Sequence, residues 1–290
     1  MEFYVGTSRF YDIVDHFWYE EGQPGQAIGG GKIEQLVEEA LGILSITGYE
    51  RRRDSLVYVG GGLPDITTKY KERNYQEVVC VGEPDDIVEE VIGKMEVGAD
   101  RIASAGGVPI FCTVTPMDIA RWNQTRLARR KTKYLRQEYN YGIMQEKHED
   151  IVIELNRRID SLNQQYHMQT PRLGAIVFPK RGALGGYRFR RDRLSADGCH
   201  LTDFTTQKWI DLLKTNADTN RHRFYSNYNE DFSDNDLADI STDKIDYEID
   251  TLSNISDIST TPSGRGLELH YNEIEGYARL LCSSQGLIQV

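Results

Sequence analysis

Three residue types that act together in serine hydrolysis occur at two distant places in this chain. Ser8 follows Gly6 in the stretch VGTSRF, where a short apolar strand runs into a helix-like segment. A serine in this position can cap a helix, or it can be a nucleophile held at the edge of a sheet. A nucleophilic serine needs a base, so the second interpretation depends on the histidines of the chain.

His200 is the histidine best placed to serve Ser8. It lies in the loop SADGCHLTD, after the last expected strand, and Asp197 stands three residues before it. The carboxylate can orient the imidazole so that its other nitrogen faces the serine. We therefore predict a catalytic triad of Ser8, His200 and Asp197. The alternative is structural, with Ser8 as a helix cap, Asp197 as a turn former and His200 bonded to it.

Strands alternate with helical segments along the chain, which predicts a mostly parallel sheet covered on both faces. The expected strands are residues 2–6, 55–62, 108–114 and 174–179, with a hairpin inside residues 66–81. The expected helices are residues 32–44, 84–105, 146–165 and 202–213. Ser8 and His200 would both follow strands at the carboxyl edge of this sheet, where α/β proteins place their sites.

Four short blocks, in this order, resemble the SGNH, or GDSL-type, hydrolases. They are VGTSRF, GQAIGGGKIEQL, VYVGGGLPDIT and SADGCHLTD. The resemblance covers about residues 1–215 and implies a three-layer α/β/α, flavodoxin-like fold with a mostly parallel five-stranded sheet. It also implies a serine esterase or acyl hydrolase that cleaves a small ester or acetylated substrate and requires no metal or other cofactor.

The resemblance also implies the donors to the oxyanion of the tetrahedral intermediate. These are the backbone N–H groups of Ser8 and Gly30, with Gly62 as a candidate for a third. Thr7 stands where the family usually has Asp, and Pro64 stands where it has an asparagine whose amide donates to the oxyanion. Proline has neither that amide nor a backbone N–H. The loss of one such donor costs on the order of 10²–10³ in rate.

Two stretches are rich in basic residues. Residues 121–136 carry seven basic residues and no acidic one, and residues 180–193 carry six against one Asp. Such runs can be solvated faces, or they can attract phosphates. The candidate anion-binding residues are Arg129, Arg130, Arg188, Arg190 and Arg191. The alternative function is therefore a catalytically impaired SGNH-fold module that binds nucleic acid or another anionic ligand, encoded by a mobile element.

Charge and composition predict three regions in the 290 residues. Residues 226–260 hold ten Asp and Glu residues against one Lys, so most of the net charge of −11 lies there. We predict a domain over residues 1–216, with a basic insertion at about residues 117–142, followed by an acidic disordered linker over residues 217–264. Residues 265–290 are expected to form a short helical segment.

The sequence predicts an intracellular, cytoplasmic protein without a membrane segment. No apolar run is long enough to cross a bilayer, and the N-terminus lacks the pattern of a signal peptide. Four cysteines without CxxC spacing suggest neither a zinc site nor a disulfide framework: Cys80, Cys112, Cys199 and Cys282. The oligomeric state is left open.

Overall fold

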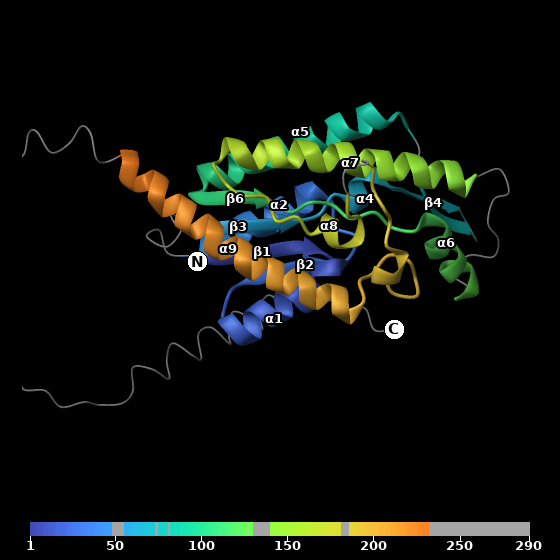
Figure 1. The fold of residues 1–290 in the computed structure, drawn as a ribbon, viewed down its shortest axis with the longest axis horizontal. Coiled ribbons are helices and arrows are strands. Elements are labelled where there is room, and N and C mark those ends of the chain that lie inside the picture. Colours follow the sequence, from blue (N-terminus) through green and yellow to red (C-terminus); the bar gives the residue numbers. More distant parts are fainter. Residues whose placement is uncertain (48–54, 73–74, 81, 130–139, 181–185, 232–290) are drawn as a thin grey trace, which may run out of the picture. The chain divides into compact units, whose positions relative to one another are not determined.

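A computed structural model describes residues 1–47, 55–72, 75–80, 82–129, 140–180 and 186–231. Its centre is a four-stranded parallel sheet of order β2-β1-β3-β6 (Figure 1). The strands are β1 (Glu2–Thr7), β2 (Gly25–Ile28), β3 (Ser55–Gly60) and β6 (Gly107–Phe111). Strands β1 and β3 are buried along their whole length. Because both faces of these strands are covered, their sequences read as continuous apolar runs.

Helices cover both faces of the sheet and complete three layers (Figure 1). Phe3 and Val57 point to one face, where they pack with α2 (Ile33–Ile46), α5 (Pro84–Ser104) and α7 (Tyr141–Gln165). Tyr4 and Tyr58 point to the other face, where they pack with α1 (Tyr11–Glu21) and α9 (Asp203–Asp231). The alternation of side chains along each strand thus divides the core into two layers.

Five short elements lie between the larger ones. They are η1 (Ser8–Phe10), α4 (Leu63–Ile66), α6 (Ile119–Ala128), α8 (Gly174–Val177) and η2 (Arg191–Arg193). The hairpin expected inside residues 66–81 is present as antiparallel β4 (Thr68–Glu72) and β5 (Tyr75–Val79). Asn123 of α6 holds it in place, because its side chain accepts a bond from Val78 N and donates one to Val78 O, at 2.9 and 2.8 Å.

The prediction of a fifth strand at residues 174–179 is wrong, because residues 174–177 form helix α8. Where a fifth strand would pair with β6, side chains of α7 form hydrogen bonds with the backbone instead. The Asn163 side chain bonds both Phe111 N and Phe111 O, at 2.9 and 2.8 Å. Asn156 does the same for Val114, at 2.6 and 2.8 Å. With these backbone groups satisfied, the described part of the sheet ends at β6.

The predicted domain boundary at residue 216 lies inside a helix, because α9 continues to Asp231. Ala217 and Asn220 are buried, and the Asn220 side chain accepts a bond from Gln169 N at 2.6 Å and donates one to Gln169 O at 2.9 Å. These contacts explain why the helix continues through a polar sequence. The rest of the acidic linker and the C-terminal segment lie outside the described residues, as does most of the basic insertion after Arg129.

Two further sequence predictions concern the cysteines and the membrane. Cys80, Cys112 and Cys199 are buried free thiols, and Cys282 lies outside the described residues. Among the described helices, none is both long enough and apolar enough to span a bilayer.

Candidate active site

Ser8, His200 and Asp197 lie together at the carboxyl end of β1. Ser8 Oγ is 3.2 Å from His200 Nε2, although 192 residues separate the two in sequence. His200 Nδ1 is 2.6 Å from Asp197 Oδ2. Ser8 is not a helix cap, since Thr7 precedes η1 in that position and Phe10 precedes α1. The contacts have the order of a serine nucleophile, its base and the carboxylate that orients the base.

Asp197 is held as an ionised acceptor. Burial raises the pKa of this carboxyl, but the hydrogen bonds it accepts together lower the pKa by more. The resulting pKa lies well below the usual range. Besides the His200 ring, three donors bond Asp197 Oδ1: Ser195 Oγ at 2.8 Å, Cys199 N at 2.8 Å and the backbone N of His200 at 3.0 Å. Oδ2 is thereby directed at the imidazole, which makes Nδ1 the donor and leaves Nε2 to accept the serine proton.

Gly198 allows the loop that carries His200 to lie against the segment before α6. Its φ is +76°, and a Cβ there would lie 2.9 Å from Arg121 Cβ. Gly198 O accepts a hydrogen bond from Asp118 N at 2.8 Å, and Ala196 O accepts one from Arg121 Nε at 2.9 Å. A side chain at residue 198 would therefore push the loop away from α6.

The segment before α6 is itself anchored to helix α7. Met117 N donates to His148 Nε2 at 3.1 Å, and Ile119 N donates to Gln145 Oε1 at 3.1 Å. Burial, together with the charge of Arg9, lowers the pKa of His148 to about 3, so this imidazole is neutral and can accept. Helix α6 then places the Trp122 ring 5.9 Å from the ring of His200, between centroids. The sequence analysis did not single out Trp122.

The glycines expected at the oxyanion site lie on either side of Ser8. Thr7 pairs with Ile28 of β2, and Gly6 pairs with Gly60 of β3. Gly30 and Gly62 each lie two residues beyond these strand partners, and both have left-handed backbones, with φ of +70° and +101°. Neither backbone N–H forms a hydrogen bond with another described residue. Both are candidate donors to a ligand, Gly30 from a half-buried position and Gly62 from a buried one.

Pro64 lies in a turn that a side chain ties to the start of α2. Asp65 Oδ2 accepts a hydrogen bond from Ile33 N, the first residue of α2, at 3.1 Å. Burial raises the pKa of Asp65. Pro64 lies in the first turn of α4, a position that proline favours. The turn is thus formed without the asparagine that the family resemblance implies.

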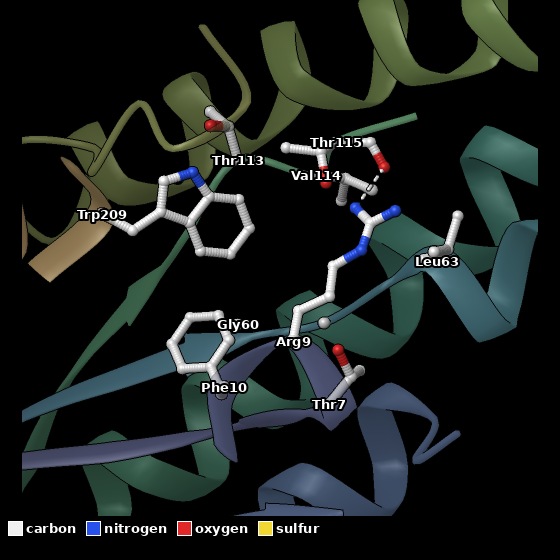
Figure 2. A pocket seen from close by; sticks show the side chains of 10 residues that line it. Thr7, Arg9, Phe10, Gly60, Leu63, Thr113, Val114, Thr115 and Trp209 are labelled. Atoms are coloured by element: carbon white, nitrogen blue, oxygen red, sulfur yellow. Dashed lines mark hydrogen bonds between the residues drawn. The ribbon is translucent and has the colours of Figure 1, made fainter. Parts of the chain in front are cut away.

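Arg9, which sequence analysis missed, is buried behind Ser8. Its guanidinium donates from Nη1 to Thr115 O at 3.0 Å and from Nη2 to Pro116 O at 3.2 Å. Burial lowers its pKa. Figure 2 shows Arg9 beside Trp209 around a cavity of about 20 Å³, which has room for one water molecule. Neither Ser8 nor His200 lines this cavity.

Two of the predicted anion-binding arginines pair with carboxylates. Arg190 pairs with Asp192 at 2.9 Å, and Arg191 pairs with Asp118 at 2.9 Å. Arg188 and Arg129 are exposed, in the loop after α8 and at the end of α6. The fifth candidate, Arg130, lies outside the described residues. Two of the five charges are thus already partnered by carboxylates.

Comparison with known proteins identifies the fold. No family model matches the sequence, and neither does any curated protein. A candidate acylhydrolase from Bacteroides fragilis NCTC 9343 superposes with a TM-score of 0.51 at 15% identity, over 76% of this chain and 87% of that one. A GDSL-like lipase from Bacteroides thetaiotaomicron VPI-5482 gives 0.49 at 15% identity, over 74% and 85%. The predicted α/β fold, a parallel sheet with helices on both faces, is confirmed.

Proposed function

We propose that this protein is a serine acyl hydrolase that cleaves an ester or acetyl group. The observation that carries the proposal is the chain of contacts from Ser8 Oγ to His200 Nε2, at 3.2 Å, and from His200 Nδ1 to Asp197 Oδ2, at 2.6 Å. Both distances are within reach of proton transfer and of hydrogen bonding. The shared fold with an acylhydrolase is consistent with this function.

The reaction begins with attack of Ser8 Oγ on the carbonyl carbon. His200 Nε2 takes the serine proton as the bond forms, and the carbonyl oxygen becomes an oxyanion. His200 then returns the proton to the leaving oxygen, the ester bond breaks, and an acyl-serine remains. Water repeats both steps, releasing the acid and restoring Ser8. Asp197 keeps the imidazole in the required tautomer and stabilises its protonated form.

The oxyanion would be bound by free backbone donors near Ser8. Gly30 and Gly62 offer N–H groups without partners in the described chain, in the turns that follow the two strands next to β1. Donors that are already in place cost no reorganisation when the charge develops. This half of the site is nevertheless short of the amide that Pro64 replaces.

A non-hydrolytic module for an anionic ligand is the second candidate, and Pro64 is the observation that favours it. The arginine pairs with Asp192 and Asp118 argue against an open phosphate-binding surface on the described chain. We therefore rank hydrolysis first and nucleic-acid binding second.

Labelling with a fluorophosphonate probe tests the proposal, because the probe reacts with activated serines. We expect the wild-type protein to be labelled, and Ser8→Ala and His200→Ala to lose the label. Ser161→Ala, an exposed serine of α7, is the matched control and should be labelled like the wild type. Absence of label from the folded wild-type protein, or persistent label in Ser8→Ala, would overturn the proposal. In the first case, salt-dependent binding of oligonucleotides is the next measurement.

A further inference from the structure

Lys69 places a cationic group at the Gly30 turn. A Cβ built on Gly30 would lie only 3.1 Å from Lys69 Nζ, so the ammonium lies directly over this turn. A Cβ at residue 30 would make a tighter contact than usual, and the lysine side chain would have to shift to relieve it. The turn is also one of the two that present free N–H groups beside Ser8.

The hairpin that carries Lys69 is fastened to the helix that covers His200. Lys69 of β4 pairs in register with Val78 of β5. The Asn123 side chain of α6 bonds both backbone groups of Val78, at 2.9 and 2.8 Å. Trp122, the preceding residue of α6, stands beside the His200 ring. The backbone of Lys69 is therefore held relative to the triad, although its side chain is exposed.

The charge of Lys69 has no carboxylate partner among the described residues, whereas Arg191 is paired with Asp118. Its field also reaches the loop of the catalytic histidine. Burial raises the pKa of the Cys199 thiol, and the charges of Arg9 and Lys69 oppose that rise. Cys199 directly precedes His200. An unpaired ammonium thus lies over one oxyanion turn and acts on the triad loop.

We infer that Lys69 Nζ is a donor to the oxyanion and replaces the amide that Pro64 lacks. The inference rests on the proposed function and adds a catalytic residue to it. A charged donor binds an oxyanion more strongly than a neutral amide does. Lys69 transfers no proton in this role, so the steps at Ser8 and His200 are unchanged.

Steady-state kinetics with a matched pair of activated esters tests this role. The substrates are 4-nitrophenyl acetate, which is neutral, and the 4-nitrophenyl monoester of succinate, which carries a carboxylate. For Lys69→Met we expect kcat to fall about 100-fold on both esters with KM nearly unchanged, because the lost contact forms with the developing charge. Lys69→Arg keeps the charge and should recover most of the rate. Lys214→Met, which breaks an ion pair with Glu21 on the α1–α9 side, is the matched control and should have no effect.

A second variant distinguishes the Lys69 ammonium from an amide at residue 64 as the donor. Pro64→Asn reintroduces the amide, and we expect it to raise kcat more in the Lys69→Met background than in the wild type. Equal gains in both backgrounds would mean that Lys69 and residue 64 act independently and would overturn the inference.

Two other outcomes would also overturn it. If Lys69→Met raised KM for the succinate monoester alone, the lysine would bind an anionic substrate group rather than the oxyanion. Unchanged kinetics on both esters would assign it no role. Fluorophosphonate labelling separates these results from failure of the proposed function. When the wild type labels at Ser8, only the role of Lys69 is rejected, and when it does not, both proposals fall.

Discussion

The two halves of the site are built in opposite ways. On the proton-transfer side, Asp197 is surrounded by donors, and the loop around it is bonded to the segment before α6. On the oxyanion side, the N–H groups of Gly30 and Gly62 have no partner in the described chain. Proton transfer needs a fixed geometry, which hydrogen bonds within the protein provide. Oxyanion binding needs donors left free, so a change there alters catalysis and leaves the fold intact.

Removal of the Asp197 charge is the largest expected disruption of the proton-transfer side, the half with fixed geometry. Asp197→Asn would present the wrong tautomer of His200 to Ser8, and we expect kcat on an activated ester to fall on the order of 10⁴-fold. The matched control is Asp192→Asn, since Asp192 is exposed and pairs only with nearby arginines. A loss below tenfold in Asp197→Asn would show that the carboxylate does not orient the base.

A methyl group at Gly30 tests the oxyanion side, the half whose N–H groups have no partner in the described chain. Its left-handed backbone and the nearby Lys69 ammonium would both resist a Cβ, which would displace the N–H. We expect Gly30→Ala to lower kcat about 10²–10³-fold, as for the loss of one oxyanion donor. Gly22→Ala has a similar φ of +63° with nothing within 4 Å, so it carries the same strain without the site. Equal kinetics for the two variants would exclude Gly30 as a donor.

Acid should lower the free energy of unfolding through His148, which anchors the segment before α6. The pKa of this imidazole is lowered to about 3 in the folded protein, against about 6.5 when unfolded. Above pH 6.5 both states are neutral. As the pH falls from 6.5 toward 3, only the unfolded chain takes up the proton, so the free energy of unfolding declines. At pH 5 we expect a loss of about 2 kcal/mol.

His148→Gln isolates this contribution, because an amide oxygen can accept from Met117 N without titrating. Urea unfolding at several pH values should show a smaller decline for the variant between pH 6.5 and 4. All other titrating groups remain in both proteins, so their contributions cancel in the comparison. Parallel declines would mean that His148 is not buried as a neutral group.

Trp122→Leu should have the smallest effect on the site. The ring lies 5.9 Å from His200 and can stabilise the imidazolium that forms during attack. The contact is worth about 0.5–1 kcal/mol, so we expect kcat to fall about threefold. Leu212→Ala, in the middle of α9, controls for a general loss of packing. A fall beyond 100-fold would mean that Trp122 positions the His200 loop as a whole.

The three residues that the sequence predicts as a triad lie within hydrogen-bonding distance of one another, and most of the elements around them match the prediction. Asp197 and His200 are close in the chain, and Ser8 directly follows a strand, so local patterns locate them. The prediction of a fifth strand at residues 174–179 was wrong because a short apolar run is compatible with a strand or with a buried helical turn. Asn163 and Asn156 decide between the two by bonding the backbone of β6 and of the segment after it, across 52 and 42 residues of sequence.

By itself, the sequence predicted most of the strands and helices, a candidate nucleophile, base and carboxylate, and the absence of an amide at Pro64. Only the tertiary structure decided which other residues share the site. Lys69, Trp122 and Arg9 come from a hairpin, a helix and a turn with no local signature of function. Their positions depend on packing between distant segments, such as the bonds of Asn123 to Val78 that join the hairpin to α6. Local patterns record backbone preference and burial, and they do not record which side chains converge across the fold.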